Sequence, residues 1–357
     1  MTLFAWTMIT VEKTSEAHDG MLKTILISLG LFVSGSALSE DGAMNDFEPE
    51  KSNLQPFAKG DVFLGATVLN NPDDDHAGRG RILQFDSDLN FKGALWTDDT
   101  THLVGGLNFA PDGTLWAFDT FAWAVVRVKP DATPLPTKRF ADRPFGSVQF
   151  MPDGGFALIE YLKGSAQPGD LTTRYPYLPD DPENVGQGKV HVYDSSETLV
   201  RTLELDVHGG VSGSMGATHT ALASDGKTLI YTSETGPRLM QFDLESGMQL
   251  DDLMTLPAGA GGGPPPMMFD VKRMNDKLVM PLGTKLTVLT ESGDVVTEAL
   301  LEGFGWALAA PGVDQTYAYA ANWFTGDVVK VSLETGEVLA RVTIAPSTLS
   351  GLIQFHG

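Results

Sequence analysis

The feature that most constrains the fold is a repeated unit of two strand-like runs joined by a tight turn that ends in Asp-Gly. Three copies are clear: "GGLNFAPDGTLWAFD" (105–119), "GSVQFMPDGGFALIE" (146–160) and "ATHTALASDGKTLIYTSE" (217–234). Asp-Gly between two alternating apolar runs is a strong signal of a β-hairpin. Looser copies occur at 267–283 and 305–321. The chain is therefore predicted to be built from repeats of one hairpin-based unit.

A second hairpin follows each of the first ones. Examples are "LMQFDLESGMQLDDL" (239–253), "LTVLTESGDVVTEAL" (286–300) and "VVKVSLETGEVLARV" (328–342). Four strands in a period of roughly 40 to 50 residues are typical of the blades of a β-propeller. The 39 glycines agree with a fold rich in turns. These observations favour an all-β protein.

The two ends of the repeat region set the number of blades. Strand-like runs at 61–69, 80–86 and 91–96 lack an innermost partner, and the run at 350–355 matches innermost strands and then stops. Pairing these segments completes one blade from both ends and removes an open sheet edge. We therefore predict a six-bladed β-propeller of four-stranded antiparallel blades over residues 61–357. It carries a lid-like insertion at 161–188.

The N-terminal region has the features of a secretory signal. From Met21, "MLKTILISLGLFVSGSALSEDG" combines Lys23, an apolar run at 24–33 and a small-x-small cleavage site at 37–39. Acidic residues precede the apolar run, so we predict that translation starts at Met21 and that residues 1–39 are upstream residues and signal peptide. Residues 40–60 are predicted to be a flexible acidic lead-in. The run is short for a bilayer span, so a periplasmic or secreted protein without stable membrane insertion is expected.

Composition excludes several classes of function. The 357 residues carry a formal net charge of −22, which repels the phosphates of nucleic acids and of anionic membranes. There are no cysteines, so disulfides and thiolate chemistry are excluded. The oligomeric state is not indicated by the sequence.

The expected propeller has one face of tight turns and one face of long loops. The loops of the second face include 70–80, 98–102, 206–216 and 257–266, together with the insertion. Long loops on a rigid scaffold are where binding and catalytic residues usually lie. We therefore predict an axial pocket for a small organic ligand on the long-loop face. Five of the seven histidines are assigned to this face or its border: His76, His102, His208, His219 and His356.

From about residue 61 to 355 the pattern resembles six-bladed propellers of the gluconolactonase (senescence-marker-protein) and strictosidine-synthase-like group. The closest match is "DGKTLIYTSETGPRLMQFDL" (225–244), which is similar to the group's strand–strand signature ending in Glu-Thr, with an Arg before the third strand. The resemblance implies a six-bladed propeller and, among the gluconolactonase members, a divalent metal on the axis.

The chain departs from the metal-binding residues of that group. Thr218 stands where the resemblance implies an asparagine, Pro265 stands where it implies an aspartate, and no glutamate begins the run at 350–355. A tight Ca²⁺ or Mg²⁺ site needs several hard oxygen ligands. The lactonase metal site is therefore not carried over, although a divalent metal of another kind stays open.

His219 is the leading candidate for catalysis. It is expected near the start of an innermost strand, where an imidazole can act as a general base or metal ligand. Glu234, Arg143 and His102 are predicted to surround it, and the arginine suits a carboxylate. A hydrogen-bonded histidine between two blades is the alternative for His219. His102, His219 and His356 together would suit Zn²⁺ or Fe²⁺ if their side chains converge.

The predicted ligand-binding residues are Glu160, Tyr161, Asn322 and Trp323. Glu160, like Glu234, ends a second strand at the expected rim of the channel, and its alternative role is a charge pair with an arginine of a neighbouring blade such as Arg238. Trp323 is suited to stacking on a sugar or an aromatic ligand, although tryptophan in a propeller also packs between blades.

Three classes of function are compatible with this pattern. The sequence favours a hydrolase of the lactonase or esterase type, or a lyase, which uses His219 as a base. The alternatives are a non-catalytic propeller of the cell envelope that binds protein or glycan, and a purely structural propeller. Fold alone does not decide among them.

Overall fold

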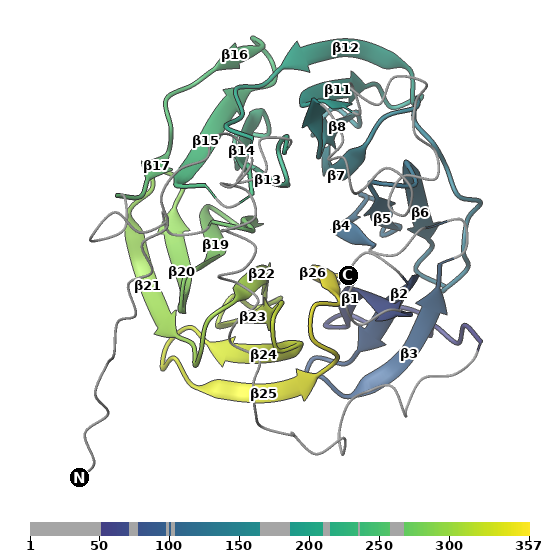
Figure 1. The fold of residues 1–357 in the computed structure, drawn as a ribbon, viewed down its shortest axis with the longest axis vertical. Helices are drawn as coiled ribbons and strands as arrows, with labels where there is room; N and C mark the ends of the chain where they lie inside the picture. The colour runs from purple at the N-terminus through teal and green to yellow at the C-terminus, as the bar shows by residue number, and fades with distance from the viewer. Residues whose placement is uncertain are drawn as a thin grey trace, which may run out of the picture. The chain divides into compact units, whose positions relative to one another are not determined.

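The computed structural model describes residues 51–70, 78–97, 100, 104–164, 186–209, 215–234, 236–257 and 268–357. The chain divides into two compact units, Met1–Gly42 and Ala43–Gly357, and the described residues all belong to the second. The predicted signal peptide, the loops that contain His76 and His102, and residues 165–185 of the insertion lie outside the described residues. The second unit is an all-β propeller of six blades around a central axis (Figure 1).

The first three blades follow the predicted strand order. Blade 1 contains β26 (Leu349–Gln354), β1 (Val62–Leu69), β2 (Gly78–Phe85) and β3 (Phe91–Trp96). Blade 2 contains β4 (Gly105–Phe109), β5 (Leu115–Asp119) and β6 (Ala124–Val128). Blade 3 contains β7 (Phe145–Phe150), β8 (Phe156–Glu160), β11 (Lys189–Tyr193) and β12 (Leu199–Glu204). The insertion in blade 3 begins and ends in a two-stranded ladder, β9 (Lys163–Gly164) with β10 (Gly186–Gln187).

The last three blades complete the ring. Blade 4 contains β13 (His219–Leu222), β14 (Thr228–Thr232), β15 (Arg238–Asp243), β16 (Met248–Gln249) and β17 (Met254–Thr255). Blade 5 contains β18 (Lys272–Met274), β19 (Lys277–Leu282), β20 (Lys285–Thr290) and β21 (Val295–Leu300). Blade 6 contains β22 (Trp306–Pro311), β23 (Tyr317–Asn322), β24 (Asp327–Ser332) and β25 (Val338–Thr343).

Blade 1 is assembled from both ends of the propeller, as predicted. Its innermost strand β26 pairs antiparallel with β1, and Val62 lies opposite Gln354. The six-bladed arrangement and the closure by a C-terminal strand are therefore confirmed. Closure covers the inner edge of β1, which would otherwise be unpaired.

Blades 2 and 4 are less regular at their outer edges. In blade 2 the fourth position is held by isolated bridges, Val125 with Lys138 and Val128 with Pro134, instead of a continuous strand. In blade 4 the outer strand is split, because β16 and β17 both pair with β15. Prolines at 134 and 136 remove backbone donors from the blade 2 edge, so a continuous ladder does not form there.

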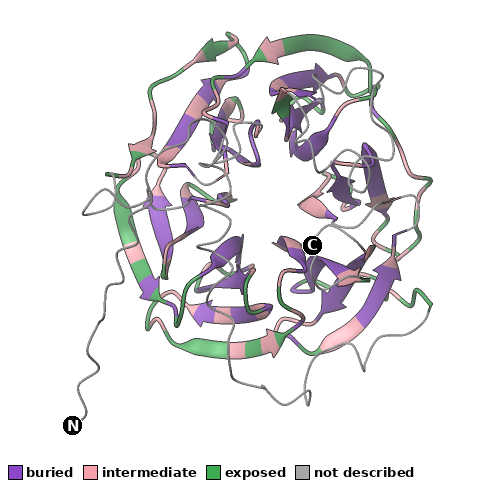
Figure 2. Ribbon diagram, viewed as in Figure 1, coloured by how far each residue is buried: buried purple, intermediate pink, exposed green. Residues whose placement is uncertain are grey.

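The apolar core lies between the blades. Within the described residues, six clusters each draw side chains from two neighbouring blades, for example Phe63 with Leu115 at blades 1 and 2, and Ile230 with Met280 at blades 4 and 5. Inner and second strands are buried, whereas outer strands alternate or are exposed (Figure 2). The alternation of outer strands such as β25 follows the period-2 pattern of a half-exposed strand. Burial between blades is therefore what holds the ring together.

Part of the predicted flexible lead-in is tied to the propeller. The Asn53 amide donates to Ala94 O at 2.8 Å, and the Phe57 amide donates to Pro130 O at 2.7 Å. The Phe57 ring packs edge-on against Phe63 at 4.5 Å between centroids. Residues 51–60 thus lie along the outer strand of blade 1 and do not form a free tether. The sequence suggested mobility because this segment lacks periodicity, although its leucine and phenylalanine still bury apolar area.

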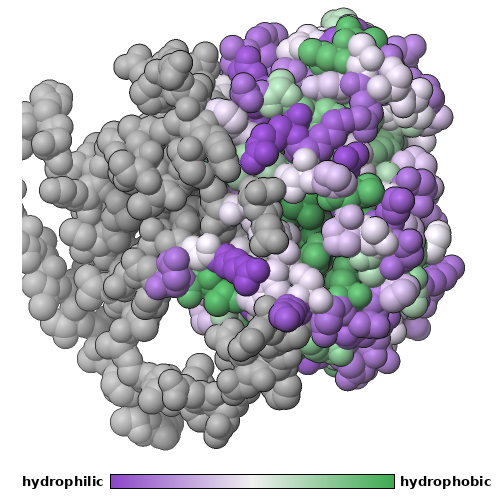
Figure 3. Space-filling model, turned by 90° about the vertical axis from the view of Figure 1, so that its right-hand side faces the viewer, coloured by the Kyte–Doolittle hydropathy of each residue, from purple (hydrophilic) through white to green (hydrophobic). Residues whose placement is uncertain are grey.

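The side of the rim that carries β3 and β6 is largely hydrophilic. Figure 3 shows the side that carries β3 and β6, where polar residues predominate and apolar residues form a band between them. In the described part of the chain, no helix has the length and apolar character needed to cross a bilayer.

Candidate functional site

The innermost strands surround a channel along the propeller axis, and the channel contains a cavity. All six of these strands run in the same direction, so their first residues share one end of the channel and their last residues share the other (Figure 1). The cavity has a volume of about 560 Å³ and is lined by residues from every innermost strand. Its wall includes Asp112 and Gly113 of a tight turn, as well as His356, which follows β26. This cavity therefore lies toward the tight-turn face, whereas the sequence predicted a pocket on the long-loop face.

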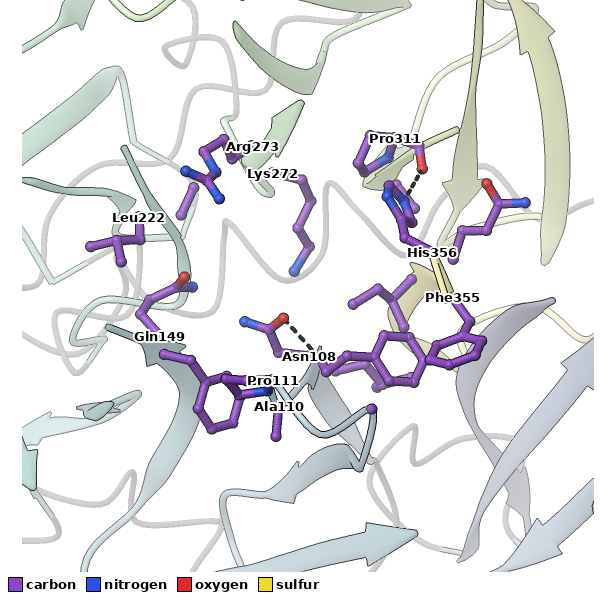
Figure 4. A pocket seen from close by; sticks show the side chains of 18 of the residues that line it. Asn108, Ala110, Pro111, Gln149, Leu222, Lys272, Arg273, Pro311, Phe355 and His356 are labelled. Atoms are coloured by element: carbon purple, nitrogen blue, oxygen red, sulfur yellow. Dashed lines mark hydrogen bonds between the residues drawn. The ribbon is translucent and has the colours of Figure 1, made fainter. Parts of the chain in front are cut away.

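Lys272 is the most prominent polar residue of the cavity. It begins β18, and its side chain extends from the wall toward the middle of the channel (Figure 4). Its ammonium lies 3.6 Å from Oδ1 of Asp270, whose carboxylate is fully buried. Oδ2 of Asp270 accepts the Ala309 amide at 3.0 Å, whereas Oδ1 accepts no hydrogen bond. Asp270 therefore links blade 5 to blade 6 through the Ala309 amide and forms an ion pair with Lys272.

His219 lies in blade 4, near the charges of Lys272 and Asp270 of blade 5. It opens β13 and directly precedes Thr220, which lines the cavity. Its Nδ1 is 3.3 Å from Thr218 Oγ1, and the side chain is half-buried. Burial lowers the pKa of His219, the nearby charge of Asp270 opposes that change, and the ammonium of Lys272 adds to it. The imidazole is consequently neutral near pH 7 and is able to accept a proton.

Most other polar side chains of the inner strands form a ring of bonds between blades. Each junction has at least one such contact: Asn108 Nδ2 to Val148 O (2.9 Å), Gln149 Nε2 to Thr220 O (2.9 Å), Arg273 Nη1 to Ala223 O (3.5 Å), the Ala309 amide to Asp270 Oδ2 (3.0 Å), His356 Nε2 to Pro311 O (3.4 Å) and Ser350 Oγ to Val104 O (2.8 Å). These bonds satisfy backbone groups that face the channel. We call this set the inter-blade ring.

Glu160 and Arg143 are brought together in blade 3, beside the ladder at the ends of the insertion. Glu160 is fully buried and accepts His191 Nε2 at 2.8 Å and the Gln187 amide at 2.5 Å, while Arg143 Nε lies 3.8 Å away. Burial by itself would raise the pKa of Glu160, but these hydrogen bonds and charges outweigh it and hold the pKa below its usual value. Because Gln187 belongs to β10, Glu160 anchors the returning end of the insertion.

Tyr161 lies beside this anchor. Its amide donates to Pro144 O at 2.8 Å, and its side chain covers Gly146 of β7 so closely that a Cβ there would come within 2.7 Å. Together with Phe121 and Met215 it packs on the buried Leu162. Tyr161 therefore stands at the first residues of an innermost strand, at the long-loop end of the channel.

Glu234, Asn322 and Trp323 lie at other blades of the long-loop face. The Glu234 amide donates to Thr218 Oγ1 at 3.0 Å, which places it next to the start of β13. The Asn322 amide group donates to Phe304 O and accepts two backbone amides of its own turn, so its polar atoms are engaged. The Trp323 ring meets Phe324 edge-on at 5.2 Å. Arg238, considered as a partner for Glu160 or Glu234, pairs instead with Asp206 and Asp252.

The predicted three-histidine site does not assemble from the residues that are described. His356 follows the end of β26 whereas His219 begins β13, so the two imidazoles lie at opposite ends of the channel. The sequence argument placed both histidines at the same height along the channel because each lies at an end of an innermost strand. It did not take into account that one lies at the start of its strand and the other after the end. His102 lies outside the described residues. Across the described ranges no group of three or more His, Cys, Asp or Glu side chains is arranged to hold a metal ion.

Sequence reasoning missed Lys272 and Asp270, although a signal for the first was present. Asn108, Gln149 and Lys272 each stand four residues before the aspartate of the turn that follows: Asp112, Asp153 and Asp276. This repeat position lines the cavity in all three blades. A comparison of the repeats position by position would have shown a cation there in blade 5. Asp270 lies within the copy at 267–283, but its position gave no such signal.

The fold and the site define a six-bladed propeller with an axial cavity, and comparisons with known proteins agree with that fold. No family model matches the chain, and no curated protein matches its sequence. Solved structures do resemble it. A nidogen/laminin complex shares 12% identity over 83% of this chain and 98% of that chain, with a TM-score of 0.55. A protein of unknown function from Bacteroides caccae shares 11% identity over 84% and 100%, also with a TM-score of 0.55. A protein from Lactobacillus plantarum shares 14% identity over 83% and 99%, with a TM-score of 0.50.

At these low identities the resemblance establishes the fold alone. The same scaffold carries many unrelated activities, so function has to be argued from the site. The similarity to gluconolactonase-like propellers beyond the shared architecture stays a prediction.

Proposed function

We propose that this protein binds a small organic ligand in its axial channel and acts on it as a lactonase-like or esterase-like hydrolase or as a lyase. The observation that carries the proposal is that Lys272 lines a cavity of about 560 Å³, while His219 of the neighbouring blade directly precedes the lining residue Thr220 and feels the charges of Lys272 and Asp270. A cavity of that size suits a small organic molecule.

Each of the two residues has a chemical role in the proposal. Neutral His219 removes a proton, either from a water molecule that attacks a carbonyl carbon or from a carbon next to a carbonyl group. In both reactions negative charge develops on the carbonyl oxygen, and the ammonium of Lys272 stabilises that charge. Asp270 keeps the ammonium in place because its buried carboxylate lies 3.6 Å behind it.

The test is a comparison of His219→Ala with the wild type on panels of lactones and esters, and on deuterium exchange next to carbonyl groups. The variant should lose about 100-fold or more in kcat, in line with the usual contribution of a general base. His208→Gln, at a histidine in the connection between blades 3 and 4, is the matched control. Because the pKa of His219 is lowered, wild-type activity should be level near neutral pH and fall only in acid. Full activity in His219→Ala would refute the proposal.

A non-catalytic ligand-binding propeller is the alternative, and one observation favours it. Asn108, Gln149 and His356 of the cavity wall already serve the inter-blade ring, so fewer groups remain for chemistry. Ligand binding without turnover by the wild type would support this alternative. Metal analysis of the purified protein comes first, because the proposal leaves open whether the protein binds a divalent metal.

Export belongs to the same proposal. The signal-like segment that begins at Met21 and the acidic composition support a periplasmic or secreted protein. N-terminal sequencing of the protein from the extracytoplasmic fraction should then give a mature start near Glu40.

A further inference from the structure

The side chains that line the cavity include a larger share of basic groups than the whole chain. The sequence has 46 acidic and 24 basic residues, so acidic side chains outnumber basic ones almost two to one. Among the side chains that line the cavity, Lys272 and Arg273 are basic and Asp112 is acidic; Gly357, the last residue of the sequence, adds its terminal carboxylate to the wall. An anionic molecule is repelled by most of this surface, and two cations inside a concave site oppose that repulsion locally.

Lys272 presents its charge to the cavity and not to bulk solvent. Its side chain is 19% exposed and points into the channel (Figure 4), while Asp270, at 0% exposure, lies behind it. Since the 3.6 Å separation exceeds a good hydrogen bond, the ammonium keeps donors for another partner. A molecule in the cavity therefore meets the cation before the carboxylate.

The other charged or titratable side chains of the wall do not take Lys272 as a partner. Arg273 makes one long bond, 3.5 Å from Nη1 to Ala223 O, and a guanidinium carries five donors in all. The carboxylate of Asp112 accepts the Thr114 amide at 2.9 Å within its own turn. Burial lowers the pKa of His356, so this imidazole adds no positive charge at neutral pH.

We propose that the axial cavity selects small anionic molecules, with Lys272 as the main contact for a carboxylate or phosphate group and Arg273 as the second. This inference rests on the proposed function and names the class of its ligand. Carboxylate and phosphate share the chemistry that both cations recognise, namely a compact group of negatively charged oxygen atoms.

The test measures binding of charge-matched pairs of molecules by calorimetry and saturation-transfer NMR. Succinate is compared with succinamide, and glucose 6-phosphate with glucose, followed by a wider panel built on the same principle. The anions should bind and their neutral counterparts should not, and affinity should fall as salt is raised. The first pair reports on carboxylates and the second on phosphates.

Three variants assign the effect to Lys272. Lys272→Met should weaken anion binding about tenfold or more, as expected for the loss of a hydrogen bond from a charged group. Because that change leaves the buried Asp270 without a cation, Asp270→Asn combined with Lys272→Met provides a second variant in which both charges are removed. Lys285→Met is the matched control, since Lys285 lies in the same blade and pairs with Glu298 outside the cavity.

The outcomes separate this inference from the proposed function. Equal binding of neutral and anionic molecules overturns the anion selectivity. Unchanged anion affinity in both Lys272 variants overturns the role of Lys272 as the main contact. Either result still leaves a site for small molecules. If no molecule of either charge binds the wild type across the panel, the proposed function fails and the inference fails with it. Selective anion binding that is lost with Lys272 and kept in Lys285→Met supports the inference.

Discussion

Glu160 shows how a carboxylate that looks functional in sequence is also needed for structure. It is fully buried, and both of its oxygen atoms accept hydrogen bonds, one from His191 and one from the backbone at the returning end of the insertion. A buried charge is tolerated only when it is paired and hydrogen-bonded in this way. The residue therefore fixes where the insertion leaves and rejoins blade 3.

Replacing this carboxylate should destabilise the protein. In Glu160→Gln, one amide hydrogen must face a donor, so we expect a loss of about 2 kcal/mol in the free energy of unfolding at pH 7. The folded-state pKa of Glu160 is lowered, so its contribution is complete above the unfolded value of about 4.3 and is lost as the pH falls through the folded value. The difference between the two proteins should therefore shrink in acid. Urea unfolding at several pH values checks this, and a difference independent of pH would contradict it.

Individual site residues were only partly predictable from the sequence. The position of His219 at the start of an innermost strand follows from the hairpin repeat, because the repeat fixes where each strand begins. The partners of a side chain depend on which neighbouring blade it faces. Asp270 and Lys272 come from the next blade, about 50 residues further along the chain, and no local pattern links them to His219.

At the scale of single elements, the innermost strands approach one another unusually closely. Gly106 in β4 has φ +58°, and a Cβ at this position would lie 1.8 Å from the carbonyl oxygen of Gly146 in β7. A glycine is required there for two reasons, the left-handed backbone and the contact between strands. The width of the channel at blades 2 and 3 depends on this contact.

Two glycine substitutions separate these reasons. Gly283 also has a positive φ, +63°, but a Cβ there would meet no atom within 4 Å. Gly283→Ala should cost about 1 kcal/mol from backbone strain alone. Gly106→Ala should cost about 3 kcal/mol or more, because the blades must also move apart. Thermal unfolding of both variants measures the difference, and equal losses would show that the close contact between blades is unimportant.

The architecture could be predicted almost completely from the sequence, whereas the position of the cavity could not. Asp-Gly turns and alternating strands are local signals, and the unmatched strands at both ends determine six blades. Blade 2 was the exception at its outer edge, where tertiary contacts replace a regular strand. The cavity depends on how far side chains from six separate strands extend toward the axis. Loop length alone therefore did not indicate this cavity, and the predicted pocket on the long-loop face involves loops that lie largely outside the described residues.

At the scale of the whole molecule, stability depends on closing the ring. Deleting residues 349–357 should expose the edge of β1 and remove two contacts of the inter-blade ring, those of Ser350 and His356. We expect the cooperative thermal transition to be lost and the protein to associate through the open edge. Deletion of residues 356–357 alone is the control and should keep the transition. Circular dichroism and size-exclusion chromatography check both, and a monomeric, cooperatively folded product of the longer deletion would contradict the prediction.

Pairing of β26 with β1 also sets the order of events during biosynthesis. The first strand of the propeller leaves the ribosome nearly 300 residues before the segment that completes its sheet. Until β26 has been synthesised, blade 1 lacks its innermost strand and the ring cannot close. Under the proposed export, this delay would suit passage through a translocation pore, because the ring could close only after both strands had crossed.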